Sequence, residues 1–355
     1  MDEQVLVQSV EDNDTVSEEA QVAGGSGGGS DDRAAAEAER LEISRVQRFW
    51  AEQGDLLLDT ARECILAAWR PGTWDRYGGV LSSYWNWLRR GGIWPITDPV
   101  ASSANYLGYL FDKGLQYKTI NVHHSGIAAR LPLFQGISLG RNVQICKLMK
   151  GIRNRRQTVK KLVPVWSVEE VLMFFVMEWG ELSILPLEQL TIKVVMLVSL
   201  VTAKRPRSLK LMTVAKDFFR QKEDSMEFVL VGWRNTQEPV VLTICEVSQL
   251  DPVTHVNEYV RRMAKIWKSD HLIVSERKPY EAANTKQIVK CLKEAIVASG
   301  QFGTGGSVRS KSATRARLRG ASQVDVMKVG DWTRVSTFME YYFKPTSVFA
   351  KAVLE

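Results

Sequence analysis

The sequence predicts a mainly helical protein with two domains and one small antiparallel sheet in the second domain. Apolar residues recur at helical spacing over most of the chain from about Leu41 onward. One segment, residues 227–244, instead places two runs of β-forming residues around a turn. A basic stretch just before Pro164 separates the two halves. Because 45% of the 355 residues are apolar, the chain can bury two domain cores.

The first 43 residues differ in composition from everything that follows. They hold 12 acidic and 2 basic residues, show no hydrophobic periodicity, and include a Gly/Ser run at Gly24–Ser30. Such a segment cannot bury enough apolar area to offset the entropy lost on ordering. We therefore expect residues 1–43 to be a disordered acidic tail with a Gly/Ser linker.

Residues 44–162 are expected to form a helical domain of about five helices. A helical pattern over residues 41–69 ends at Pro71-Gly72, and Thr73 is suited to cap the helix that follows. Further helices are predicted near residues 99–113, 118–131 and 141–156.

Residues 163–355 are expected to form a second, mostly helical domain. Ser167 precedes two glutamates, which favours a helix start because acidic side chains suit the positive end of the helix dipole. The expected elements are helices near 167–179, 187–201, 251–267 and 283–298, a hairpin of 227–231 with 240–244, a short strand at 272–274, and helices over the last 50 residues.

The distribution of charge favours a nucleic-acid partner. The whole chain carries +7, but residues 44–355 alone carry +17, and a surface of that charge attracts polyanions. The most basic run is Lys150, Arg153, Arg155, Arg156, Lys160 and Lys161. We interpret it as a clamp on the DNA backbone; the alternative is a solvated linker.

Several classes of protein are disfavoured. The N-terminus is acidic and no apolar run reaches about 18 residues, so neither a secretory signal nor a membrane span is expected. The four cysteines lie far apart, without a CxxC pair or a neighbouring histidine, which disfavours a disulfide scaffold or a zinc site. We expect no metal, no cofactor and a reducing compartment.

Three short segments place arginine, tryptophan and tyrosine in a fixed order. They are Thr202-Ala-Lys-Arg205-Pro-Arg207-Ser208, Ser307-Val-Arg309-Ser310, and Gly330-Asp-Trp332 continued by Ser336-Thr-Phe338-Met-Glu-Tyr341-Tyr342. Their order and spacing resemble the motifs of the tyrosine recombinase (phage-integrase-like) family. The interdomain segment from Met149 to Leu172 and the Gly330-Asp-Trp332 motif are similar to those of its DIRS-type retrotransposon subgroup.

The resemblance covers about residues 60–350 and implies a fold. The helical part would be a SAM-like core-binding domain, residues 44–162. Residues 163–355 would be an α+β tyrosine-recombinase catalytic domain with one small antiparallel sheet. Family members close around duplex DNA and act as four protomers on two sites, so double-stranded DNA and a DNA-bound homotetramer are the implied partners. Integration or excision of a mobile element, in the nucleus, is the implied task.

The resemblance also implies a role for each motif residue. A tyrosine hydroxyl attacks a backbone phosphodiester to give a 3′-phosphotyrosine link and a free 5′-hydroxyl, so no ATP or metal is needed. Arg205 and Arg309 would hold the phosphate oxygens through charge-assisted bonds, and Trp332 would donate its indole N–H. Tyr342 matches the subgroup spacing better than Tyr341, which fits the spacing of bacterial relatives.

Two expected catalytic side chains are missing. The family's hairpin lysine should lie in residues 232–235, where only Arg234 is basic. Arg234 could contact the phosphate, but an arginine is a poor proton donor because its pKa exceeds about 12. The histidine of the second motif falls at Gly306. A domesticated relative that binds DNA without efficient cleavage is therefore the main alternative to an active recombinase. A weaker alternative is a helical DNA-binding or scaffold protein whose motifs match by chance.

Overall fold

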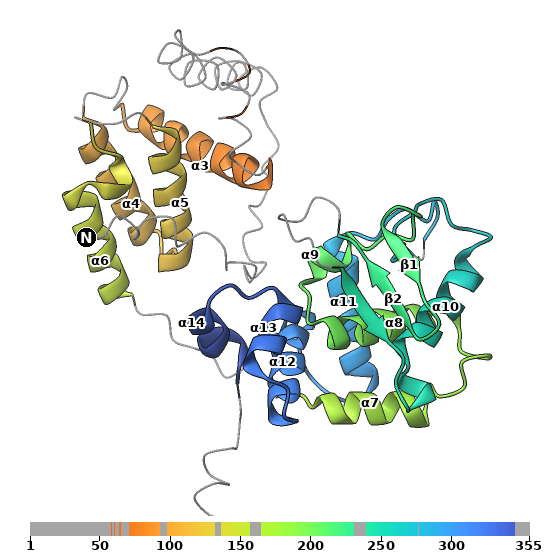
Figure 1. Cartoon of the computed structure of the whole chain (residues 1–355). Coiled ribbons are helices and arrows are strands. Elements are labelled where there is room, and N and C mark those ends of the chain that lie inside the picture. The colour runs from red at the N-terminus through yellow and green to blue at the C-terminus, as the bar shows by residue number, and fades with distance from the viewer. Residues whose placement is uncertain are drawn as a thin grey trace, which may run out of the picture. The chain divides into compact units, whose positions relative to one another are not determined.

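The computed structural model describes residues 71–92, 98–131, 136–156, 165–230, 239–275 and 277–344, together with positions 58, 60 and 64. These residues form two compact units, one ending at Arg156 and one beginning at Val165 (Figure 1). The predicted tail of residues 1–43 lies outside the described residues, as do Lys160, Lys161 and Arg234.

The first unit is entirely helical in its described part. Its elements are α3 (Pro71–Arg90), α4 (Pro99–Asp112), α5 (Tyr117–Arg130), the 3-10 turn η1 (Leu139–Arg141) and α6 (Val143–Arg155). Helix α3 begins at Pro71 and not at the predicted cap Thr73, because proline is tolerated in the first turn, where its missing N–H needs no partner. The carboxylate of Asp98 caps α4, and the amide of Asn142 caps α6.

Arg156 joins the end of α6 to the loop between α4 and α5. Its Nη1 donates a hydrogen bond to the Leu115 carbonyl oxygen at 2.6 Å. Its guanidinium lies 4.0 Å from the centroid of the Phe111 ring, a cation–π contact. The sequence interpretation assigned Arg156 to DNA binding, but in the structure this side chain makes contacts within its own unit.

The second unit is built around the buried helix α8 (Leu187–Thr202). Every residue of α8 from Leu190 to Ser199 is buried, and the helix contacts α10 (Pro252–Met263), α11 (Thr285–Ala298) and β3 (Val240–Thr243). Helix α7 (Val168–Met177) starts where Ser167 was predicted to start it, with the Ser167 hydroxyl accepting from the Glu170 N–H. No described helix is both long enough and apolar enough to cross a membrane.

A single three-stranded antiparallel sheet lies in the described part of this unit. Its order is β1 (Phe219–Gln221), β2 (Ser225–Phe228), β3, and Phe228 pairs with Phe219 on one side and Val240 on the other. The mainly helical fold with one small antiparallel sheet confirms the predicted fold class. The predicted hairpin is β2 with β3; β1 was not predicted.

The predicted strand at residues 272–274 is wrong. Leu272, Ile273 and Val274 are buried, but only isolated bridges form here, between Thr213 and His271 and between Val274 and Ala282. The run is apolar because it fills the core, and a short apolar run alone does not distinguish a strand from another buried segment.

The last described elements complete the unit. They are α9 (Pro206–Leu209), the 3-10 turns η2 (Ser248–Leu250) and η3 (Gly305–Ser307), α12 (Val308–Leu318), α13 (Gln323–Gly330), α14 (Val335–Thr337) and the π-helical turn η4 (Phe338–Tyr342).

Replacing Arg156 with alanine should destabilise the helical unit. The change removes one hydrogen bond and one cation–π contact, so we expect the free energy of unfolding to fall by about 1–2 kcal/mol. Urea unfolding followed by tryptophan fluorescence measures it. Arg153→Ala is the matched control, because Arg153 is exposed on the same helix and should change stability by less than about 0.5 kcal/mol. Equal effects of the two substitutions would contradict the anchoring role.

Candidate active site

Arg309 lies at the centre of a cluster that holds three of the predicted site residues. It is the second residue of α12, and only 5% of it is exposed. Its Nη2 donates to the Gly330 carbonyl oxygen at 2.6 Å. The carbon of its guanidinium is 4.1 Å from the Trp332 ring centroid and 5.0 Å from that of Tyr342. Residues from three elements therefore meet around one buried cation.

The turn at the end of α13 positions Trp332. Asp331 adopts the left-handed conformation (φ 57°), and the Trp332 N–H then donates to the Met327 carbonyl. A Cβ on Gly330 would lie 1.9 Å from Cζ3 of the Trp332 ring, so only glycine fits there. The Trp332 indole N–H is buried and makes no hydrogen bond within the described residues. A buried donor without an acceptor costs about 1–3 kcal/mol, so this N–H is available to a ligand oxygen.

The Tyr342 segment is docked on α12 of the same chain. The Tyr342 carbonyl accepts hydrogen bonds from Ser310 Oγ at 2.8 Å and Thr314 Oγ1 at 3.1 Å. Its ring centroid is 4.8 Å from that of Trp332. Tyr341, in contrast, is 51% exposed. The structure thus places Tyr342 in the cluster with Arg309, which favours Tyr342 as the attacking residue; its role stays a prediction.

Lys204, the residue before Arg205, forms an ion pair that joins the first motif to the third. Helix α8 ends with Ala203 in the left-handed conformation, and Lys204 Nζ then contacts Asp331 Oδ2 at 2.6 Å. Arg205 is half-buried and extended, as expected for a residue before proline, and is the N-cap of α9. The ion pair of the preceding Lys204 thus links this part of the chain to the turn that holds Trp332. That the Arg205 guanidinium points to the same phosphate as Arg309 stays a prediction.

Sequence reasoning missed the residues that hold the motifs together. Lys204 and Asp331 are 127 positions apart, and no local pattern identifies such a pair. Ser310 belongs to the second motif and Thr314 lies four residues after it, and neither was predicted to hold the Tyr342 segment. Their spacing of four on a helix was the available signal, because it puts both hydroxyls on one face.

Of the two positions at which the sequence departs from the motifs it resembles, Gly306 and Arg234, the structure describes only Gly306. Gly306 is exposed in η3, and a Cβ built there meets no atom within 4 Å. The position therefore has room for a side chain that the chain lacks. Arg234 lies outside the described residues. Among those that are described, no three His, Cys, Asp or Glu side chains lie close enough to hold a metal ion.

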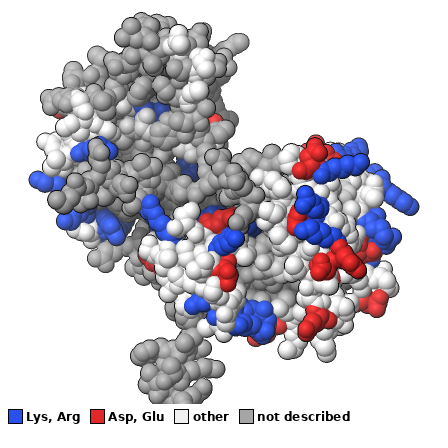
Figure 2. Space-filling model, viewed as in Figure 1, with Lys and Arg blue, Asp and Glu red and all other residues white. Residues whose placement is uncertain are grey.

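The predicted DNA-binding residues that are described lie at the end of α6. Lys150, Arg153 and Arg155 are exposed, whereas Arg156 is half-buried by the contacts given above. In the view of Figure 2, the described surface of the helical unit carries Lys and Arg side chains with few acidic ones, while the second unit shows both charges interleaved. The first unit therefore presents the more uniformly basic surface in this view.

Solved structures share this fold, although no family model and no curated protein matches the sequence. The XerH site-specific recombinase, bound to a palindromic difH substrate after cleavage, has a TM-score of 0.55 and 13% identity over 79% of this chain and 79% of its own. A fragment of the Tn1549 transposon integrase, in complex with circular intermediate DNA, has a TM-score of 0.51 and 16% identity over 87% of this chain and 99% of its own. The fold is therefore that of the tyrosine recombinases.

Gly330→Ala should displace Trp332 from the cluster. The added methyl group overlaps the indole ring, so we expect a loss of about 1–3 kcal/mol in the free energy of unfolding, typical of overpacking, and a changed tryptophan fluorescence spectrum. Gly306→Ala is the control, since its Cβ enters open space and should leave both measurements nearly unchanged. An unperturbed Gly330→Ala protein would mean that the ring does not lie against Gly330.

Proposed function

We propose that the protein is a site-specific DNA recombinase that breaks and rejoins duplex DNA through a 3′-phosphotyrosine intermediate on Tyr342. The observation that carries the proposal is the cluster of Arg309, Trp332 and Tyr342, in which a buried cation and a buried N–H donor lie beside a tyrosine. The shared fold with recombinases solved on DNA supports it.

The chemistry follows from what these groups can donate. The Tyr342 hydroxyl attacks the phosphorus, its O–P bond forms, and the bond to the 5′-oxygen of the next nucleotide breaks. Negative charge then grows on the non-bridging oxygens. Arg309, the Trp332 indole N–H and Arg205 would stabilise that charge, and donors already fixed in a buried site need little reorganisation to do so.

The position of the Tyr342 ring sets a condition on substrate entry. Arg309 is only 5% exposed, and the rings of Trp332 and Tyr342 lie over its guanidinium. A phosphate that contacts the Arg309 guanidinium would therefore have to displace one of these rings. The hydrogen bonds from Ser310 and Thr314 hold the Tyr342 backbone, so a rotation of the side chain alone would open the site.

The proton transfers are the weak part of this site. The leaving 5′-oxygen needs a proton, and a well-placed general acid commonly contributes about 10² to 10⁴ in rate. Gly306 has no side chain to transfer a proton, and Arg234 holds its proton too tightly to serve. We therefore infer slow cleavage on ordinary DNA.

The biological setting is also part of the proposal. The sequence resemblance to DIRS-type retrotransposon recombinases supports integration or excision of a mobile element in the nucleus, by a homotetramer assembled on two double-stranded DNA sites.

One observation favours a second candidate function, a DNA-binding protein that has lost efficient cleavage. Gly306 is exposed at the position where the family has a histidine, and a Cβ built there meets no atom within 4 Å. No neighbour among the described residues therefore occupies the space of the missing side chain. The intact cluster around Arg309 favours the enzyme.

A nicked suicide substrate should trap a covalent protein–DNA adduct that Tyr342→Phe abolishes and Tyr341→Phe spares. The adduct should form slowly on normal DNA and far faster on a 5′-bridging phosphorothiolate, whose leaving group needs no proton. Denaturing gel electrophoresis of the adduct measures both rates. Tight DNA binding with no adduct, even from the activated substrate, would contradict the recombinase proposal and support a DNA-binding protein that has lost cleavage.

The same assay tests why cleavage is slow. Gly306→His combined with Arg234→Lys should raise the rate on normal DNA by at least about tenfold, because each change restores a proton-transfer group. The rate on the phosphorothiolate should change little. An equal gain on both substrates would mean that the substitutions act on binding.

Affinity for duplex DNA should fall steeply as salt rises. Each neutralised phosphate contributes about 0.9 to the slope of log K against log salt, so Lys150→Ala with Arg153→Ala should flatten the slope by about 2. Fluorescence anisotropy over a salt series measures it. Arg261→Ala, which removes an exposed cation already paired with Glu258, is the control. A slope near zero in the intact protein would show that the basic run is only a solvated surface.

A further inference from the structure

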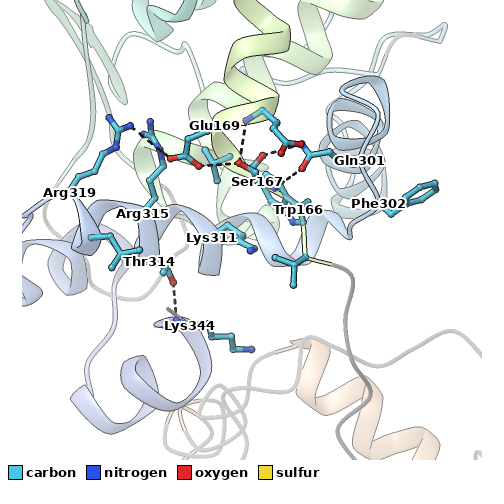
Figure 3. Close-up of a pocket in the computed structure, with 14 residues that line it drawn as sticks. Trp166, Ser167, Glu169, Gln301, Phe302, Lys311, Thr314, Arg315, Arg319 and Lys344 are labelled. Carbon is cyan, nitrogen blue, oxygen red and sulfur yellow. Dashed lines mark hydrogen bonds and ion pairs between the residues drawn. The ribbon is translucent and has the colours of Figure 1, made fainter. Parts of the chain in front are cut away.

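A cavity of about 690 Å³ lies in the second unit, on the side of α12 away from Arg309. Four residues of α12 line it: Lys311, Thr314, Arg315 and Leu318. Their spacing of three or four positions puts them on one face of the helix, and Arg309 lies on the opposite face. The start of α7 and the loop after α11 form the opposite wall (Figure 3). Its size is typical of ligand-binding pockets, and nothing in the proposed chemistry uses it.

The cavity lining has an excess of two cations, because four basic residues (Lys311, Arg315, Arg319 and Lys344) and two acidic residues (Glu169 and Glu170) form it. Glu169 pairs with Arg315 at 2.7 Å and contacts Arg319 at 4.0 Å, as Figure 3 shows. Within the described residues, neither Lys311 nor Lys344 forms an ion pair. Burial lowers the pKa of Lys311, and the nearby Glu169 carboxylate offsets this only in part. An anionic occupant would supply the counter-charge that these two lysines lack.

The same cavity exposes apolar side chains to solvent. Val165 is 70% exposed, Phe302 is 78% exposed and Leu318 is 55% exposed. Trp166 is buried behind them, with its indole N–H bound to the Ser307 hydroxyl at 2.7 Å. Apolar side chains next to cations fit a segment that carries both aliphatic and carboxylate side chains, which is a common way for a groove to bind a peptide.

We propose that this cavity binds the acidic N-terminal segment of the protein, residues 1–22. That segment has seven acidic residues, no basic residue, and six Val or Leu residues interspersed among them. It thus complements both the cations and the apolar side chains of the cavity. The other segment outside the described residues near Lys344, residues 345–355, carries one lysine and one glutamate and offers no such charge match.

Docking there would act on the tyrosine-bearing segment. The Thr314 hydroxyl lines the cavity, donates to the Tyr342 carbonyl and accepts from the Lys344 N–H. An occupant held by Lys344 would stabilise the docked position of this segment, with the Tyr342 ring over Arg309. The binding itself does not rest on the proposed function, because it can be measured without DNA.

A photoreactive residue in the full-length protein tests the occupant directly. Phe302 is replaced by benzoylphenylalanine, the protein is irradiated, and cross-linked peptides are identified by mass spectrometry. We expect cross-links to residues 1–22. The same photoreactive residue at Met177, which is 75% exposed on α7 outside the cavity, should give at least fivefold fewer. Cross-links to residues 345–355 in place of residues 1–22, or none to either segment, would overturn the proposal.

Charge reversal shows whether the cations select the segment. Lys311→Glu with Lys344→Glu should lower the yield of cross-links from position 302 to residues 1–22 by roughly fivefold or more, since two favourable charge pairs become repulsive. Lys216→Glu, an exposed site outside the cavity, should leave the yield unchanged, and circular dichroism checks that each variant is folded. A yield unaffected by the double reversal would also reject the proposal. Failure of DNA cleavage, in contrast, would leave these results standing.

Discussion

A cation buried at the positive end of a helix is unfavourable in isolation, and Arg309 occupies that position at the start of α12. The Gly330 carbonyl and the faces of two aromatic rings make this burial tolerable. The Trp332 ring requires a glycine at position 330, because a side chain there would overlap the indole. Asp331 has to adopt the left-handed conformation to turn the chain toward Trp332. The core of the candidate active site consists of Arg309 and three residues that contact its guanidinium, Gly330, Trp332 and Tyr342.

Helix α12 connects the site to the rest of the second unit. One side carries Arg309 and Ala313 against Trp332, and the other lines the cationic cavity. Between them, Ser310 and Thr314 hold the Tyr342 backbone. The same helix therefore positions the cation, the tyrosine and the proposed peptide site. Any ligand that changes the position of α12 or of residues 342–344 acts on all three.

The site has groups that can stabilise negative charge but, among the described residues, lacks groups that can protonate the leaving oxygen. Arg309 and the Trp332 N–H, which has no hydrogen-bond partner among the described residues, are groups that can stabilise a negatively charged phosphate, whereas Gly306 stands where the motif it resembles has a histidine. These two demands are physically separable, because stabilising an anion and protonating a leaving group are different interactions. A protein can keep the first without the second, so this structure is compatible both with an active recombinase and with a DNA-binding protein that has lost efficient cleavage.

The sequence by itself determined the elements and the order of the motifs. Helical periodicity, the cap at Ser167 and the turn before Val240 are local properties, and they predicted the helices and the hairpin. The contact of Arg309 with Trp332 and Tyr342, the pairing of Lys204 with Asp331, and the burial of residues 272–274 without a strand were decided by the tertiary structure. The reason is that partners over 20 to 130 positions apart leave no periodic signal, and only packing brings them together.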